Sequence, residues 1–257
     1  MSSVATAFAD SRTMVRREIR HTSRNPGQLV LAMLAPLIML LLLDFAFGGA
    51  LDTKGVEYID YVVPGIILLG AGYGAQATAL AVNADATEGV IDRFRTMAIV
   101  RSSVLVGHVV GSTVRSLIGI AVVVLVALAI GFRPHADAVQ WLAVIGTVAL
   151  TLVAFACLAT AFGLVAKDAA GASGMSFPLA LLPFLSGAFV PTDTMPGWLR
   201  AFAANQPMTQ IIDTLRALLL GGPLGNHAWL AVAWCCGIAV VGFGWAATVF
   251  SRRAAAG

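Results

Sequence analysis

Apolar residues in this chain gather in long runs that are separated by short polar stretches. A helix needs about 20 apolar residues to cross the hydrocarbon core of a membrane, because it rises about 1.5 Å per residue. Six runs approach or exceed that length, so the pattern predicts an all-α, polytopic membrane protein with six transmembrane helices. The third run has an ambiguous start, since residues 104–114 are also mostly apolar. The runs cover about residues 28–47, 59–82, 116–132, 138–166, 172–190 and 228–250.

The first 28 residues form a polar, basic arm. Phe8, Val15 and Ile19 fall near one helical face, and arginines cover much of the rest. This pattern predicts an amphipathic helix that lies along a membrane surface in contact with lipids. The arginines that we expect at this interface are Arg16, Arg17 and Arg20.

A long connection, residues 191–226, separates the fifth and sixth runs. It exceeds usual loop lengths, and it carries an apolar stripe that needs a partner surface. We expect two short helices that dip back into the outer leaflet as a re-entrant hairpin. An amphipathic helix lying flat on the membrane is the alternative. The stripe consists of Ile211, Ile212, Leu215, Leu218 and Leu219.

Composition and charge support the membrane assignment. Hydrophobic types make up 59% of the chain and charged types 11%, whereas a soluble domain carries roughly 25% charged residues. The net charge of +3 is too small and too scattered to indicate nucleic acid as a partner. Few basic residues fall in the predicted outer loops, namely Lys54, Arg133, Arg200 and Arg216. The positive-inside rule therefore places both termini in the cytoplasm. The excess of Arg over Lys suggests a GC-rich bacterial genome, so we expect the chain in a bacterial cell membrane.

Some short motifs match functional patterns but lack the surroundings that those functions need. Residues 70–75 fit the dinucleotide pattern G-x-G-x-x-G/A, yet they lie in an apolar run with no room for a βαβ unit. Gly70 and Gly74 instead predict a small-residue face that lets membrane helices approach. No P-loop sequence for ATP occurs. Neither the cysteines nor the dispersed histidines match a metal site, so we expect no cofactor or metal in this chain.

One motif would indicate an enzyme. It is the quartet Gly171-Ala172-Ser173-Gly174, which matches the G-x-S-G signature of rhomboid proteases. A serine nucleophile needs a base within hydrogen-bond reach. The only later histidine is His227, which we expect at the other membrane face, roughly 25–30 Å away. An intramembrane serine protease therefore stays as an alternative, together with a non-transporting membrane scaffold.

Few ionisable residues lie within the apolar runs. A charged side chain at the bilayer centre costs about 2.5–3.5 kcal/mol. We expect Asp44, near the outer end of the first run, and Arg115, near the start of the third, to reach an interface. The aromatic residues that could line a lipophilic path, but more often pack, are Phe45, Phe47, Phe155, Phe162 and Phe184.

Two windows of the sequence resemble the permeases of ABC type-2 transporters, the daunorubicin-resistance (drug exporter) branch in particular. The first is Ala86-Thr87-Glu88-Gly89-Val90-Ile91-Asp92-Arg93-Phe94-Arg95-Thr96-Met97, continued by residues 100–107. The second covers residues 184–191, 195–199, 205–209 and 215–221. Ala98 stands where the family often has Pro, and His108 where it often has Arg, which puts local helix geometry and a charge contact in doubt.

The resemblance implies a permease that exports a lipophilic, drug-like or lipid- or glycan-linked substrate. It implies two permease subunits, as a homodimer or a heterodimer, that pair with two separate ATP-binding subunits. ATP and Mg²⁺ would then bind to that partner, and this chain would not itself be an enzyme. Order, spacing and the six-run layout agree over essentially the whole chain, which is consistent with a single transmembrane domain, residues 1–257.

Residues 83–103 are the most polar internal stretch, and we expect a cytosolic coupling helix there that docks in a cleft of the ATP-binding subunit. Acids near the start of such a helix suit its dipole, and the arginines that follow can pair with acids of the partner. A solvated loop is the alternative. The expected coupling residues are Glu88, Gly89, Asp92, Arg93, Phe94, Arg95 and Arg101; those of the outer re-entrant motif are Gly187, Pro191, Pro196, Trp198, Pro207 and Arg216.

Overall fold

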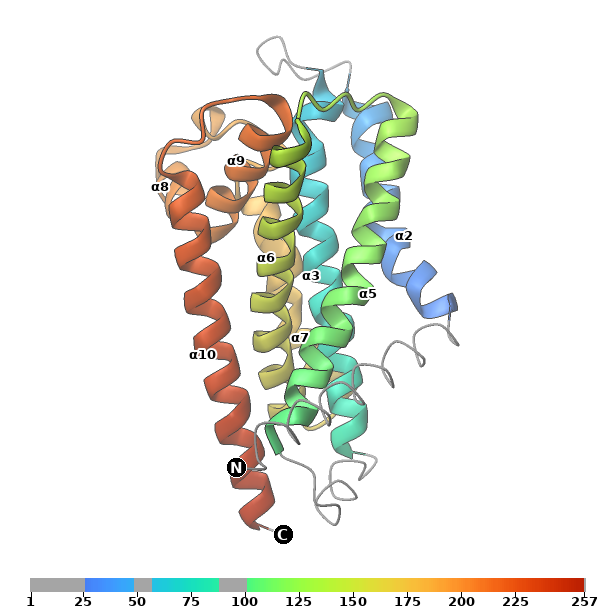
Figure 1. The fold of residues 1–257 in the computed structure, drawn as a ribbon, viewed down its shortest axis with the longest axis vertical. Coiled ribbons are helices and arrows are strands. Elements are labelled where there is room, and N and C mark those ends of the chain that lie inside the picture. Colours follow the sequence, from blue (N-terminus) through green and yellow to red (C-terminus); the bar gives the residue numbers. More distant parts are fainter. Residues whose placement is uncertain (1–25, 49–56, 88–100, 257) are drawn as a thin grey trace.

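The computed structural model describes residues 26–48, 57–87 and 101–256. In these ranges the chain is helical and contains no β-strand, as the apolar pattern predicts. The helices stand side by side in an elongated bundle (Figure 1). Four of them have the length and apolar composition needed to cross a membrane. These are α3 (Tyr58–Thr87), α5 (Arg101–Ile130), α6 (Ala138–Val165) and α10 (His227–Ala256).

Two shorter apolar helices occupy the places of the first and fifth predicted spans. The first is α2 (Pro26–Leu42), which ends in a π-helical turn, Leu43–Phe47. The second is α7 (Ala169–Leu181), which continues as a 3₁₀ turn, Leu182–Leu185. α7 therefore ends well before residue 190, because Pro183 has no N–H to continue the α-helical hydrogen bonds.

The structure also moves the boundaries of the polar stretch 83–103. α3 extends to Thr87 and α5 begins at Arg101, so both ends of this stretch belong to long helices. α5 runs without a break through residues 104–114, so the helix begins well before the unbroken apolar run. Arg115 consequently lies near the middle of α5, not near its first residue.

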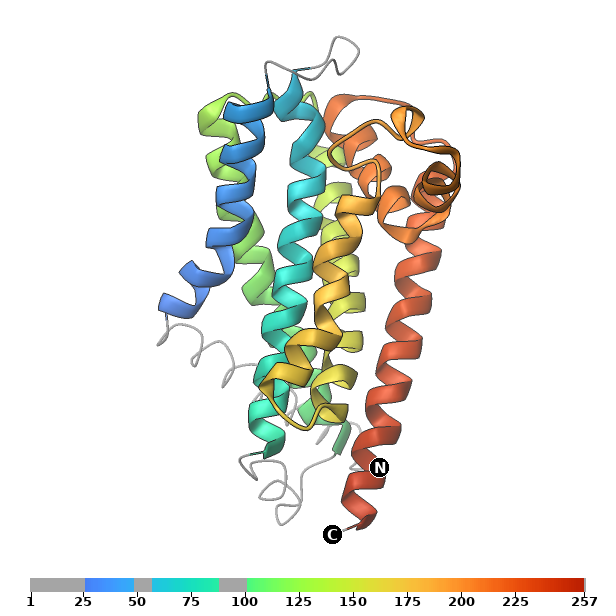
Figure 2. The same ribbon diagram turned by 180° about the vertical axis from the view of Figure 1, so that it is seen from behind.

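The bundle has two distinct ends (Figures 1 and 2). The lower end carries Thr87, Arg101, the α6–α7 turn and the end of α10. The upper end carries a 3₁₀ turn, Thr192–Thr194, and two short helices, α8 (Gly197–Asn205) and α9 (Pro207–Leu220). α2 and α10 lie at opposite edges of the bundle, and α3 lies between them in contact with α2, α5, α6, α7 and α9.

Local sequence explains where the helices start and stop. Asp137 caps α6 by accepting a hydrogen bond from the Gln140 amide, and the Gln140 side chain accepts one in return from the Asp137 amide. Asp168 caps α7 through the Gly171 amide and closes the short turn after α6. Gly221 ends α9 in the left-handed conformation, with φ of 77°, which glycine adopts without steric cost.

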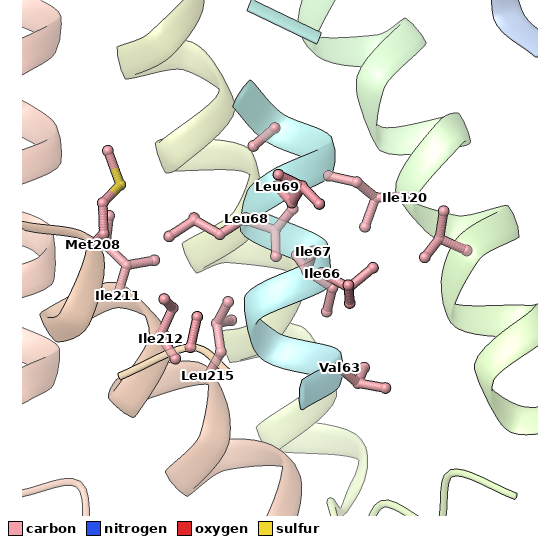
Figure 3. Close-up of a cluster of buried hydrophobic side chains, with 14 of the residues drawn as sticks. Val63, Ile66, Ile67, Leu68, Leu69, Ile120, Met208, Ile211, Ile212 and Leu215 are labelled. Atoms are coloured by element: carbon pink, nitrogen blue, oxygen red, sulfur yellow. The ribbon is translucent and has the colours of Figure 1, made fainter. Parts of the chain in front are cut away.

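α9 is inserted between the long helices. Its buried side chains, among them Met208, Ile211 and Leu215, join one apolar core with Ile66 and Leu69 of α3 (Figure 3). Those α3 residues lie roughly 12–16 Å along the helix from Tyr58. The apolar stripe predicted for the outer connection thus has its partner surface inside the bundle.

Three glycines bring helix backbones into direct contact. A Cβ atom built at Gly72 of α3 would lie 2.6 Å from the Cα atom of Ala180 in α7. One built at Gly163 of α6 would lie 2.5 Å from the carbonyl oxygen of Ala79 in α3, and one at Gly242 of α10 would lie 2.7 Å from the amide nitrogen of Leu158 in α6. These contacts join α7, α3, α6 and α10, which we call the glycine-packed block.

The flank formed by α2 and α5 meets α3 differently. Gly70 faces side-chain atoms of Ile120 in α5 and Pro36 in α2, and Gly74 faces the Ser116 hydroxyl of α5. Gly70 and Gly74 therefore form the predicted small-residue face, but against side chains. Gly72, which lies between them in the sequence, contacts the backbone of α7 instead.

The backbone contact at Gly242 predicts a large difference between two glycines of α10. Gly242→Ala is expected to destabilise the protein by about 1–3 kcal/mol, because the added methyl group has no space against α6. Gly244→Ala, two residues away, meets nothing within 4 Å and should be neutral or slightly stabilising, since alanine favours a helix. Thermal unfolding of the detergent-solubilised protein measures both; equal midpoints for the two variants would contradict the packing.

Candidate functional site

The lower end of the bundle flanks the predicted coupling segment. The arm residues Arg16, Arg17 and Arg20 lie outside the described residues, as do the coupling residues Glu88, Gly89, Asp92, Arg93, Phe94 and Arg95. Arg101 is the first residue of α5. The structure therefore shows the helix ends that hold this segment.

Asn83 joins the lower end of α3 to the end of α6. Its side chain is 2% exposed, and its Nδ2 atom donates hydrogen bonds to the carbonyl oxygens of Gly163 at 3.2 Å and Ala166 at 2.9 Å. The last carbonyls of a helix have no partner within that helix. A side chain from α3 thus caps α6, a role that the sequence did not reveal because Asn83 begins the polar stretch.

A second contact joins α3 to α5 at the same level. The Nε2 atom of His108 lies 3.3 Å from a carboxylate oxygen of Asp85, and both side chains are mostly buried. His108 is the position at which this chain departs from the family pattern, where Arg is frequent. The structure shows that a contact with an acid exists here.

At the upper end, Arg216 of α9 organises a polar cluster. Its guanidinium lies over the Tyr61 ring, 4.0 Å from the centroid, and bonds Asp213 at 2.8 Å. It also donates to the carbonyl oxygen of Gly187 at 2.9 Å, which accepts a further hydrogen bond from the Tyr61 hydroxyl at 2.9 Å. The cluster ties α9 to α3 and to the stretch before α8, so it joins two residues of the predicted outer motif, Gly187 and Arg216.

The other members of that motif have separate roles. Pro191 precedes the 3₁₀ turn, Pro196 precedes α8, and Pro207 is the first residue of α9. Proline suits these positions because the first amides of a helix need no carbonyl partner. Trp198 lies on α8 with 76% of its surface exposed, away from the Arg216 cluster.

Glutamine and threonine side chains join α8 to α9. Gln206 donates to the Leu185 carbonyl oxygen at 2.6 Å, and Gln210 donates to that of Ala204 at 2.8 Å. Thr209 donates to the Ala203 carbonyl oxygen. The Thr209 and Gln210 bonds satisfy carbonyls near the end of α8, whereas the Gln206 bond satisfies the last carbonyl of the 3₁₀ turn after α7. No sequence pattern had assigned these bonds.

Ser173 lies in the second turn of α7, at the lower end, where its hydroxyl accepts a hydrogen bond from Gln76 at 2.7 Å. His227 begins α10 at the upper end and contacts Gln210 at 2.8 Å. The two are at opposite ends of the bundle, as expected from the sequence. The structure therefore gives no support to a serine–histidine pair.

A shallow groove lies between α2, α3 and α5. Its lining is mostly apolar and includes Pro36, Gly70 and Gly119, with Arg115 as its charged member. The Arg115 guanidinium lies 3.5 Å from the Thr78 hydroxyl. The groove lies where side chains of α2 and α5 meet the Gly70 and Gly74 face of α3.

Four of the five candidate path-lining aromatic residues divide into two groups, and the side chain of the fifth, Phe47, lies outside what the structure describes. Phe155 is buried, and Phe162 packs edge-on against Trp245, so both belong to helix packing. Phe45 and Phe184 are exposed. Within residues 26–48, 57–87 and 101–256, no three His, Cys, Asp or Glu side chains gather in a way that could hold a metal.

Comparison with known proteins finds relatives that are named as transporter permeases. A daunorubicin resistance ABC transporter permease protein from Streptomyces coeruleorubidus is 32% identical over 223 residues, which cover 84% of this chain and 77% of that protein. A probable doxorubicin resistance ABC transporter permease protein from Mycobacterium tuberculosis is 23% identical over 234 residues, covering 91% and 85%. A putative transport permease from Pyropia yezoensis is 27% identical over 218 residues, covering 80% and 72%.

The family profile of ABC-2 type transporters matches residues 10–220. This region runs from the basic arm to the last residue of α9, so it includes both sequence windows and both ends of the bundle. The chain therefore belongs to the ABC-2 type transporter family.

Proposed function

We propose that this chain is the membrane-spanning permease subunit of an ATP-driven exporter for lipophilic, drug-like compounds. The observation that carries the proposal is the family match over residues 10–220, together with relatives named for resistance to daunorubicin and doxorubicin. The bundle of long apolar helices fits a subunit that forms a membrane path. Lipid- or glycan-linked molecules are the second substrate class.

The energy for export comes from a separate subunit that binds ATP and Mg²⁺. This follows from the sequence, because a chain without a P-loop has no such site to place at its lower end. Two permease copies, or this chain with a paralogue, would complete the membrane part. Residues 1–257 act as one domain.

The six-span arrangement places the lower end in the cytoplasm. α2 with its π-helical turn, and α7 with its 3₁₀ turn, lie beside the four long helices (Figures 1 and 2), and we take them as the two further spans. The basic arm, the polar stretch and the basic C-terminal tail then share the inner side, which agrees with the positive-inside rule. Both termini are cytoplasmic.

The outer connection combines the two arrangements that the sequence allows. α9 enters the outer leaflet, because its buried face packs at the depth of Ile66 and Leu69. α8 lies at the membrane surface with Trp198 and Phe202 turned outward, and tryptophan is enriched at membrane interfaces. Together the two helices close the outer end of the path.

Coupling to the ATP-binding subunit occurs through residues 88–101, with the basic arm beside them. Of the cytoplasmic pieces, only this segment is attached at each end to a long helix, α3 and α5. The arm, the Lys167-Asp168 turn and the tail lack such a double attachment or are too short. Force generated by ATP therefore enters the membrane part where α3 ends.

Labelling of single cysteines tests the orientation. In a variant whose three native cysteines are replaced by alanine, Asp52→Cys and Pro223→Cys are expected to react with an impermeant maleimide added to intact cells. Val90→Cys should react only after the cells are permeabilised, because it lies on the cytoplasmic side. Reaction of Val90→Cys from outside would overturn the orientation.

Charge reversal tests the coupling segment. Glu88→Arg and Arg93→Glu are expected to lower drug-stimulated ATP hydrolysis and drug uptake into inverted vesicles by tenfold or more, since a broken interfacial charge pair costs about 2–5 kcal/mol. Glu57→Arg is the matched control, because Glu57 is exposed just before α3 at the upper end. Membrane insertion should be equal in all three variants.

Two outcomes would contradict the proposed coupling or the proposed export. Normal transport by both Glu88→Arg and Arg93→Glu would show that the segment is a solvated loop. Absence of ATP-driven uptake by the unmodified complex, co-expressed with its ATP-binding subunit and tested with daunorubicin and with fluorescent lipid, would favour a membrane scaffold.

A further inference from the structure

The lower end of α3 is bonded on two sides. Asn83 and Asp85 are two residues apart, so their side chains leave the helix on nearly opposite faces, about 200° apart. Asn83 bonds the end of α6, and Asp85 contacts His108 of α5. The last turn of α3 therefore cannot shift without carrying a neighbour or breaking one of these contacts.

The two contacts differ in their surroundings. Asn83 is fully buried, and its two hydrogen bonds meet carbonyl oxygens at the end of α6. The Asp85 and His108 side chains are 21% and 11% exposed, so water can compete for the contact between them. Movement of α3 is thus passed more firmly to α6 than to α5.

α6 is also the helix through which movement can spread. At Gly163 the backbone of α6 lies against Ala79 of α3, one turn above Asn83. At Gly242 the backbone of α10 lies against Leu158 of α6. By contrast, the glycine face of α3 that meets α2 and α5 contacts side chains and lines a groove. A contact between side chains can adjust by a change of rotamer, whereas a contact between two backbones cannot.

We propose that Asn83 is the positioning residue that passes displacement of the lower end of α3 to α6, and so makes α3, α6, α7 and α10 move as one unit during transport. This role rests on the proposed function as an ATP-driven exporter. Asn83 does not contact the substrate; it fixes the distance between two helices at the point where force enters. Without it, α3 can slide on α6, and ATP hydrolysis continues with less transport.

The decisive quantity is the amount of drug transported per ATP hydrolysed. Asn83→Leu keeps the branched shape and the number of heavy atoms of the side chain but removes both hydrogen bonds. It is expected to lower this ratio about 3- to 18-fold, the factor that corresponds to one interhelical hydrogen bond in a membrane. ATP hydrolysis and the amount of assembled complex should stay close to those of the unmodified complex, and the unfolding temperature should fall by only a few degrees, because two carbonyl oxygens of α6 lose their partner. A residue needed only for folding would lower assembly and leave the ratio unchanged.

Thr87→Val is the matched control. Thr87 is one turn further along α3, and its hydroxyl bonds only carbonyl oxygens of its own helix, those of Asn83 and Ala84. Its loss should leave the ratio unchanged. If Asn83→Leu fails to assemble, Asn83→Ser replaces it, because serine is too short to reach both carbonyls, and it is judged by the same ratio.

The outcomes separate this proposal from the proposed function. A ratio in Asn83→Leu equal to that of the unmodified complex overturns the role of Asn83 while the exporter function stands. A fall of the same size in Thr87→Val also overturns it, since any loss of polarity at this turn would then suffice. An unmodified complex that moves neither drug nor lipid contradicts the exporter function and this role together.

Discussion

The close approach of helix backbones at Gly72, Gly163 and Gly242 is the constraint on which the rest of this structure depends. Lipid tails are as apolar as leucine, so burying apolar side chains gives membrane helices little reason to associate. Association then depends on close packing, and glycine permits the shortest distance. Each of these glycines meets backbone atoms of a neighbouring helix. There is therefore no space for an added methyl group at these contacts between α7, α3, α6 and α10.

The outer helices are built onto this block. α9 packs on α3, α6 and α10, and Arg216 bonds it to Tyr61 and Gly187. Gln210 satisfies a carbonyl oxygen near the end of α8, and Gln206 satisfies the last carbonyl oxygen of the 3₁₀ turn after α7, which lets α9 lie among apolar side chains. On the proposed role of Asn83, a displacement that begins there would reach the outer end through these contacts, whereas the Gly70 and Gly74 face of α3 meets α2 and α5 through side chains.

The sequence predicts the parts of this fold that depend on local pattern. The apolar runs mark the helices, and Pro, Gly and Asp residues mark their starts and ends. The outer connection forms helices with a buried stripe, as its spacing indicates. The start of α5 was ambiguous because a single charge, Arg115, interrupts an apolar stretch that is helical throughout.

What depends on tertiary contacts could not be read from the chain. Gly70, Gly72 and Gly74 look alike in sequence, yet Gly72 meets a backbone and the other two meet side chains. Asn83 looks like the start of a polar loop, and its role appears only when the end of α6 is placed beside it. The predicted coupling residues from Glu88 to Arg95 lie outside the described residues, and their role stays a prediction.

Distances between spin labels, measured with and without ATP in a complex labelled on one permease copy, test most directly whether the block moves as a unit. One pair, at the exposed positions Ala84 of α3 and Ser251 of α10, lies within the block; the other, at Ile38 of α2 and Val240 of α10, spans from the flank to the block. The first distance should stay the same when ATP binds, and the second should change. A change in the Ala84–Ser251 distance as large as that between Ile38 and Val240 would contradict a rigid block.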